Sequence, residues 1–322
     1  MRASVQEKFF ELLRYSIGSS DIAPILSCAG MSEIYAMAKK QSLMAVLLEG
    51  IKRMDGPDSK MTEVETDAYE NLIMEWVGKG MLSARNNDTL NKNVAGVFDE
   101  FEKKGFECSL LKGQGNALLY PHPEVRQVGD IDLWIRLKNS DHKNIDRDVR
   151  NIIAFVRKEM PNSRALYHHI DYKKYNGTEV ELHYRPHFML NLISNSRLQK
   201  YFLDHADEQF HHFVEIGGAQ IAVPTLHFNI VFQLSHIYQH LFHEGIGLRQ
   251  VLDYFWLLID WKKARPDNWT VKDSSSVLRY LGLYHIAGAL MWILVNEFGM
   301  NPDFVIVEPD ERRGKFVLNE IL

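Results

Sequence analysis

The sequence has little of what defines several large classes of protein. It contains two cysteines, Cys28 and Cys108, which lie far apart and form no Cys-x-x-Cys pair. Neither a disulfide framework nor a structural zinc site is therefore expected. No apolar run reaches the roughly 18 residues of a membrane-spanning helix, and the N-terminal stretch "MRASVQEKFFELLRYS" carries charges among its apolar residues. We expect a cytoplasmic protein that has no membrane partner.

The chain also lacks an excess of basic residues. It has 37 lysines and arginines against 42 acidic residues, a net charge of -5. A protein that grips nucleic acid mainly through phosphates needs a positive field, which this balance does not supply, although a local basic patch remains possible. The 322 residues, 46% of them apolar and 25% charged, are typical of a soluble chain of two or three modules.

The hydrophobic pattern divides the chain into three parts. Residues 1–104 have apolar residues at helical spacing and predict an N-terminal helical module, which "GKG" at 78–80 could break. Residues 105–223 predict an α+β core, and residues 224–322 predict a C-terminal helical module. In the last part, residues 274–299 read as one long helix.

The middle part contains short apolar runs that are typical of strands. These are "FECSLLK", "DIDLWI", "HHIDYKKY" and "EVELHY", separated by turn or helical segments. An amphipathic pattern over residues 145–160 predicts a helix lying across the sheet. The expected picture is a small sheet between two groups of helices.

Two aspartates interrupt one of these apolar runs, in "VRQVGDIDLWI". Because a strand alternates its faces, Asp130 and Asp132 point the same way while Ile131 and its alternate neighbours face the core. A bare Asp-x-Asp is often only a solvated strand end. A third carboxylate, Glu181, is central in the later strand "TEVELHYRPH". Three carboxylates that meet at one point are what a pair of Mg²⁺ ions requires.

A glycine turn precedes the aspartates, in "LLKGQGNALLYP". The chain runs there from an apolar strand through Gly113 and Gly115 into a short predicted helix, so backbone N–H groups could face an anion. Lys112 adds a positive charge suited to triphosphate oxygens. Many turns of this kind bind nothing, so the signal gains weight only from its place shortly before Asp130.

Together these motifs resemble a known family. "LKGQGNALLYPHPEVRQVGDIDLWI" followed by "VELHYRPH" resembles the polymerase-β-like nucleotidyltransferase superfamily, and more closely a bacterial group, the uncharacterised nucleotidyltransferases of family five. The resemblance is specific over about residues 105–187 and fainter over the flanking helices. It implies a polymerase-β-like nucleotidyltransferase core, a small mixed β-sheet with helices.

The resemblance implies an enzyme that transfers a nucleoside monophosphate from an NTP to an acceptor hydroxyl and releases pyrophosphate. It implies a two-metal mechanism in which Asp130, Asp132 and Glu181 hold two Mg²⁺ ions, with Mn²⁺ as a possible substitute. The nucleotide-binding residues are expected to be Lys112, Gly113, Gly115, Arg126 and Gly129. The superfamily's usual Gly-Ser is Lys112-Gly113 here, so the hydroxyl that often touches a phosphate is absent.

Several polar residues are expected to line the cleft beside the sheet. They are His183, His236, His240, Arg249 and Asp253. His183 lies on the strand face of Glu181 and could instead satisfy a hydrogen bond in the core. Arg249 and Asp253, one helical turn apart, could pair with each other. Arg126 could bind phosphate or form a salt bridge with an aspartate of its own loop.

The acceptor is not readable from the sequence, and rival functions remain open. A small molecule, a protein side chain or an RNA end could receive the nucleotide, and toxin-like modification of tRNA belongs to the same class. A non-catalytic nucleotide-binding or regulatory module could keep this fold. The histidines His236, His240 and His243 have helical spacing, so with Asp253 they could instead form a metal-dependent phosphohydrolase.

Overall fold

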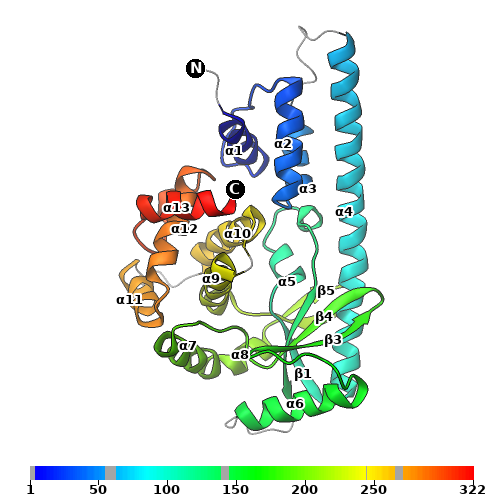
Figure 1. Cartoon of the computed structure of the whole chain (residues 1–322), viewed down its shortest axis with the longest axis vertical. Coiled ribbons are helices and arrows are strands. Elements are labelled where there is room, and N and C mark those ends of the chain that lie inside the picture. The colour runs from blue at the N-terminus through cyan, green and yellow to red at the C-terminus, as the bar shows by residue number, and fades with distance from the viewer. Residues whose placement is uncertain (1–3, 55–62, 139–144, 244, 265–270) are drawn as a thin grey trace.

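A computed structural model describes residues 4–54, 63–138, 145–243, 245–264 and 271–322 of the chain. It is an α+β protein in which a small mixed sheet lies among helices, so the expected fold class is confirmed (Figure 1). The helices are α1 (Val5–Ser16), α2 (Cys28–Lys40), α3 (Met44–Ile51), α4 (Glu63–Lys103), α5 (Gln114–Ala117), α6 (Ile145–Glu159), α7 (Leu192–Asp204), α8 (Ala206–His211), α9 (Leu226–His243), α10 (Leu248–Ala264), α11 (Val271–Leu281), α12 (Tyr284–Asn296) and α13 (Glu311–Ile321), with short 3₁₀ turns η1 (Pro123–Val125) and η2 (Pro302–Phe304). The strands are β1 (Phe106–Leu110), β2 (Ile131–Leu137), β3 (His169–Tyr175), β4 (Thr178–His183), β5 (Phe213–Ile216) and β6 (Ala219–Ala222).

The main sheet places the acidic strands side by side. Its order is β1-β2-β4-β3; β2 and β4 are parallel, and the other neighbours are antiparallel. Asp132 of β2 lies in register with Glu181 of β4. Paired residues of adjacent strands point to the same face, so the two carboxylates share one side of the sheet.

Both faces of the sheet are covered. Ile131, Leu133 and Ile135 face a core that includes residues of α4 and α6. On the opposite face, Trp134 stacks on Phe228 of α9 with ring centroids 5.7 Å apart. Because Asp132 shares that face with Trp134, α9 buries the carboxylate as well.

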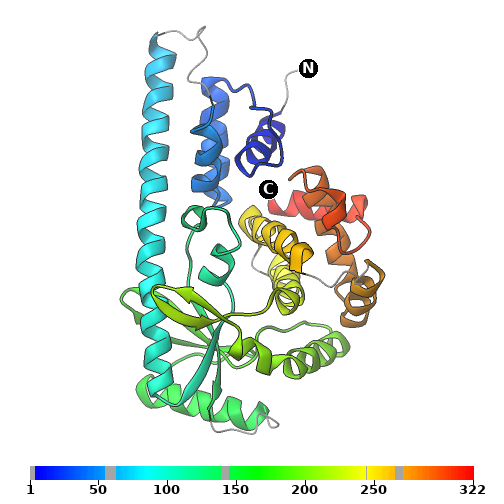
Figure 2. The same cartoon turned by 180° about the vertical axis from the view of Figure 1, so that it is seen from behind.

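The helix α4 is continuous for 41 residues and forms the long edge of the molecule in Figures 1 and 2. The expected break at Gly78–Gly80 was therefore wrong. Packing explains why glycine occurs at two positions inside this helix. A side chain at Gly80 would overlap Leu48 of α3, and one at Gly96 would overlap Tyr175 of β3. These glycines let neighbouring elements approach the helix.

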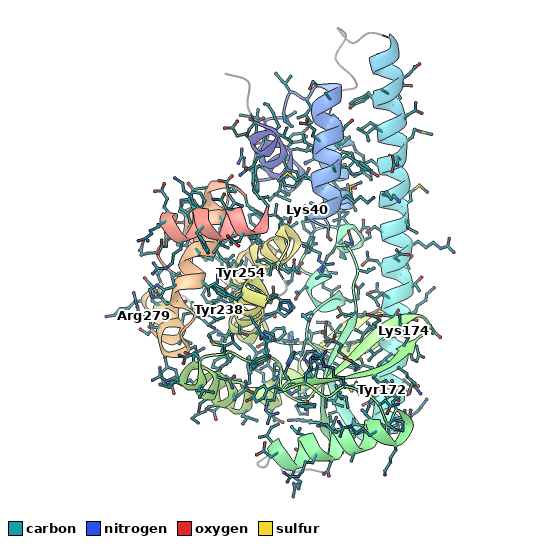
Figure 3. All side chains as sticks on the ribbon, in the orientation of Figure 1. Lys40, Tyr172, Lys174, Tyr238, Tyr254 and Arg279 are labelled. Atoms are coloured by element: carbon teal, nitrogen blue, oxygen red, sulfur yellow. The ribbon has the colours of Figure 1, made fainter. Side chains whose placement is uncertain are left out.

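The N-terminal and C-terminal helices share one hydrophobic core, separate from the core beneath the sheet. Tyr254, labelled in Figure 3, is fully buried in α10, and its hydroxyl donates to the carbonyl oxygen of Ile230 in α9 at 3.3 Å. Gln41, at the end of α2, donates to the carbonyl of Ile321 at 3.0 Å. Helices from both ends of the sequence thus support one another beside the sheet.

The segment 274–299 is two helices rather than the single helix that was expected. Gly282, with a φ of 78°, separates α11 from α12. Other residues rarely adopt such a φ, and glycine there ends a helix readily. Within the described ranges, no helix is long and apolar enough to cross a membrane.

Candidate functional site

The three acidic residues lie at one edge of the paired strands β2 and β4. Asp130 directly precedes β2, Asp132 is the second residue of that strand, and Glu181 belongs to β4. Asp132 is 1% exposed, whereas Asp130 and Glu181 are partly exposed. Asp130 and Glu181 line a cavity of about 300 Å³. Asp130 and Asp132 line a second cavity of about 190 Å³.

Lys112 and His183 connect these carboxylates. The Lys112 Nζ lies 2.9 Å from Asp132 Oδ1, because the backbone N–H of Leu111 donates to the Asp132 carbonyl and aligns the two segments. The His183 Nε2 lies 3.1 Å from Asp132 Oδ1 and 3.3 Å from Glu181 Oε2. These positive or proton-donating groups offset the repulsion among neighbouring carboxylates.

The pKa values of the acids are driven apart by their surroundings. Burial alone would raise the pKa of Asp132, but Lys112 and His183 outweigh it and hold that pKa below its usual range. The negative charge of Asp132, with burial, raises the pKa of Asp130. For Glu181, the hydrogen bond from His183 outweighs burial and lowers the pKa. Separated pKa values of this kind are common at sites of acid–base chemistry.

The smaller cavity has a cationic wall. Lys112, Gly113, Arg126, Gly129 and Arg249 all line it. Gly113 has a φ of 62° and a ψ of -114°, a backbone conformation that favours glycine. The following helix α5 has only four residues, so the helix terminus expected there is weak.

Gly115 is placed differently from the other expected nucleotide-binding residues. It is not among the residues that line either cavity beside Asp130. A side chain there would contact Val223, which follows β6. Gly115 therefore serves packing between α5 and the β5–β6 hairpin in this structure.

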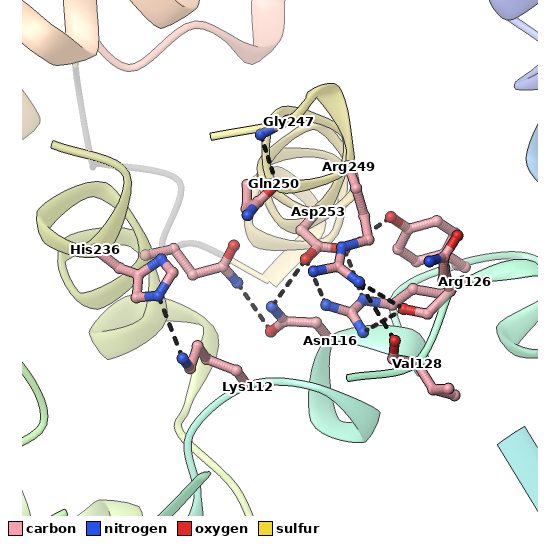
Figure 4. Close-up of polar contacts among 12 residues, drawn as sticks. Lys112, Asn116, Arg126, Val128, His236, Gly247, Arg249, Gln250 and Asp253 are labelled. Atoms are coloured by element: carbon pink, nitrogen blue, oxygen red, sulfur yellow. Dashed lines mark hydrogen bonds and ion pairs between the residues drawn. The ribbon is translucent and has the colours of Figure 1, made fainter. Parts of the chain in front are cut away.

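Arg126 pairs with Asp253 of α10, and not with an aspartate of its own loop (Figure 4). Its Nε and one terminal nitrogen each lie 2.8 Å from an Asp253 oxygen, and the Tyr120 hydroxyl donates to the same carboxylate at 2.7 Å. Arg249 donates instead to the backbone carbonyl of Gln127 at 3.1 Å. Of the alternatives left open by the sequence, the structure therefore has the Asp253 carboxylate held by Arg126 in a two-pronged contact, and not by Arg249.

The histidine stripe of α9 faces the site. His236 and His240 line both cavities, and His236 Nε2 lies 3.3 Å from Lys112 Nζ. Burial and Lys112 lower the pKa of His236 well below its usual value. Within the described part of the chain, neither histidine belongs to a group of three side chains close enough to hold a metal. The side chain of His243 lies outside the described residues.

Three histidines that the motif did not single out also lie at the site. His168 and His169 begin the β3 edge next to Glu181, and His187 follows β4. The His169 Nδ1 lies 3.5 Å from Glu181 Oε2 and 2.9 Å from His168 Nε2. The dipeptide "HH" at the start of a predicted strand was the available signal, but only the β3–β4 register brings it to Glu181.

The mixed sheet, with its paired acidic strands and flanking helices, is that of a nucleotidyltransferase-like core. The chain belongs to the family of uncharacterised nucleotidyltransferases, whose model matches residues 27–294. The match extends beyond the sheet to α2–α4 and to α9–α12, and of these helices α9 and α10 line the cavities of the site. No curated protein and no solved structure matched the chain.

Proposed function

We propose that the protein is an active, metal-dependent enzyme that transfers a nucleoside monophosphate from an NTP to an acceptor hydroxyl. The observation that carries this proposal is the register of Asp132 with Glu181, with Asp130 directly before the same strand and lining both neighbouring cavities. Family membership supports the general reaction. The roles of individual residues below are part of the proposal.

The smaller cavity is the proposed site of the triphosphate. Lys112 and Arg249 bring positive charge to its wall, and Gly113 and Gly129 leave the backbone uncovered. Arg126 also lines this cavity, but its positive charge is largely balanced by its ion pair with Asp253. Cations fixed in advance stabilise the charge that builds up on a departing pyrophosphate.

The larger cavity is the proposed site of the acceptor. Its hydroxyl oxygen forms a bond to the α-phosphorus as the bond from that phosphorus to the bridging oxygen breaks, and pyrophosphate leaves with that electron pair. The proton of the hydroxyl passes to a carboxylate that lines the larger cavity, either Asp130 or Glu181. Small molecules, protein side chains and RNA ends all remain candidate acceptors.

The carboxylates of the site fit divalent cations, and ligand atoms of Asp132, Glu181 and His183 lie within 4.8 Å of one another. Asp130, Asp132 and Glu181 supply carboxylate oxygens, the ligands that Mg²⁺ and Mn²⁺ accept, and they are the residues that would hold two such ions. When bound, the ions would polarise the phosphate and lower the pKa of the acceptor hydroxyl. Lys112 balances the negative charge of Asp132 and so reduces the repulsion among the carboxylates when no cation is bound.

The test is to incubate the purified protein with each α-labelled NTP, Mg²⁺ and a cell extract, and to follow the label into RNA, protein and small molecules. Label in one fraction is expected, and it identifies the class of acceptor. Asp132→Asn should reduce incorporation at least about 100-fold, because it removes a preorganised charge from the reacting centre.

Glu179→Gln is the matched control, since Glu179 lies in β4 two residues before Glu181 but is exposed and pairs with Lys174 at 2.9 Å. It should leave incorporation unchanged. If the wild-type protein labels no fraction with any NTP, the proposal fails in favour of the non-catalytic nucleotide-binding module.

A further inference from the structure

Nitrogen atoms gather around the outer acid of the site, Glu181. His183 Nε2 lies 3.3 Å and His169 Nδ1 lies 3.5 Å from the same oxygen, Glu181 Oε2. His168 adjoins them, with its Nε2 2.9 Å from His169 Nδ1. Asp130 has no hydrogen bond to a histidine among the described contacts, whereas the buried Asp132 shares His183 with Glu181. The two ends of the acidic site therefore differ in their donor atoms.

We propose that Glu181, His169 and His183, with His168 beside them, bind a first-row transition-metal ion of the zinc or cobalt type. Ligand atoms of His168, His169 and His183 all lie within 4.8 Å of one another. Those of Asp132, Glu181 and His183 do so too. Two overlapping groups that share His183 describe one mixed nitrogen and oxygen site, and His168, His169, Glu181 and His183 line the larger cavity.

The choice of metal follows from the ligands. Mg²⁺ is a hard ion that takes oxygen ligands and keeps several waters, and imidazole is a poor ligand for it. Imidazole suits zinc, iron, nickel and copper, and cobalt(II) reports on such sites through its visible absorption. A site with three imidazoles and one or two carboxylates therefore selects a transition metal over Mg²⁺.

Unused nitrogen atoms supply an independent observation. His183 Nδ1 and His187 Nε2, both on side chains only 2% exposed, have no hydrogen-bond partner within the described part of the chain. The same is true of His168 Nδ1. Leaving such a buried atom unpaired is unfavourable, because it has lost its hydrogen bond to water and gained none in return. Both His183 and His187 line the larger cavity, so the unsatisfied nitrogens lie where a ligand would enter.

This inference rests on the proposed function and refines it: of the two ions proposed there, the one held at Glu181 would be a transition metal in place of Mg²⁺. Binding of this metal can be measured without any transfer reaction. The chelator-treated protein would be titrated with Co²⁺ while visible absorption is recorded, and with Zn²⁺ by calorimetry. One ion per chain is expected, and a hundredfold excess of Mg²⁺ should not displace it.

His169→Gln and His168→Gln should each weaken Zn²⁺ binding by at least about tenfold, since loss of even an outer-shell partner costs roughly 10- to 100-fold. His211→Gln is the control, because His211 is exposed on α8 and lines neither cavity beside Asp130. Circular dichroism and thermal melting would establish that each variant is folded. His168 is only partly buried, so its variant remains informative if His169→Gln fails to fold.

The outcomes separate the two proposals. Absence of a Co²⁺ spectrum, displacement by Mg²⁺, or unchanged Zn²⁺ affinity in both folded variants would overturn the metal assignment while leaving nucleotidyl transfer intact. Tight Zn²⁺ binding that depends on His168 and His169, in a protein that transfers no nucleotide, would support the metal site and count against the enzyme.

Discussion

Asp253 shows how one side chain can hold two parts of the molecule in place. Its carboxylate, buried in α10, accepts hydrogen bonds from Arg126 and Tyr120 of the segment that leads to β2. Asp253→Asn would leave the Arg126 guanidinium without its anion. We expect it to lower the free energy of unfolding by about 3–5 kcal/mol, measured by urea denaturation.

Asp260→Asn, in the same helix, is the matched control. Asp260 contacts Lys263 at 2.7 Å in a partly exposed pair, which contributes only about 0–1 kcal/mol. Equal effects of the two substitutions would show that the Arg126–Asp253 contact does not stabilise the fold.

The same carboxylate predicts a pH dependence. Burial opposes ionisation of Asp253, but Arg126 outweighs it and lowers the pKa below that of the unfolded chain. A group of this kind stabilises the protein above its unfolded pKa, roughly 3.9 for aspartate, and that stability is lost as the pH falls through the folded pKa. Wild type should therefore lose more stability than Asp253→Asn between about pH 5 and pH 2. Parallel curves for the two proteins would contradict the assignment.

At the scale of elements, two glycines of α4 should respond in opposite ways to substitution by alanine. Nothing lies within 4 Å of where a side chain at Gly78 would be, whereas one at Gly96 would meet the Tyr175 hydroxyl. Gly78→Ala should stabilise the protein by about 0.5–1 kcal/mol through helix propensity. Gly96→Ala should destabilise it by about 1–3 kcal/mol through overpacking. Thermal unfolding of both variants tests this, and a gain from Gly96→Ala would refute the packing at β3.

The sequence predicted those elements whose cause is local. Alternating apolar residues predicted β2 and β4, and the amphipathic pattern predicted α6. The possible break at Gly78–Gly80 does not occur. Gly80 instead leaves room for Leu48 of α3 to pack against the continuous helix, and the local sequence does not show this contact. Gly282 was missed as a helix end although glycine often has that role, since apolar spacing continues on both sides of it.

The site was predictable only where the motif is contiguous. Asp130, Asp132 and Glu181 were named from strand periodicity and family resemblance, and the structure brings them to one edge. Strand periodicity gives a face but no register, so the approach of His169 to Glu181 was not readable. The Arg126 contact with Asp253 spans 127 residues and has no local signal at all.

At the scale of the whole molecule, the two cavities of the site differ in the polar side chains that line them. Arg249 lines only the smaller one, and Gln239 lines only the larger one. Arg249→Gln should weaken NTP binding about 10- to 100-fold, the equivalent of one hydrogen bond to a charged group. Equilibrium titration with a fluorescent NTP would measure it.

Gln239→Leu tests the other cavity. It should leave NTP binding unchanged and raise the KM for the acceptor by about 2- to 10-fold, the worth of a neutral hydrogen bond. The reverse pattern, with Gln239→Leu weakening NTP binding and Arg249→Gln not doing so, would exchange the two cavities in the proposed reaction.

The contribution of α9 and α10 to the site has a consequence for dissecting the protein. A fragment that stopped at Val223 would retain all three acids but would lose His236, Arg249 and Asp253. Trp134 of β2 would then lose its contact with Phe228, and the buried Arg126 would lose the carboxylate of Asp253. The segment that carries the recognisable motif therefore depends on the later helices to complete its cavities, and the family match over residues 27–294 includes α9 and α10 as well.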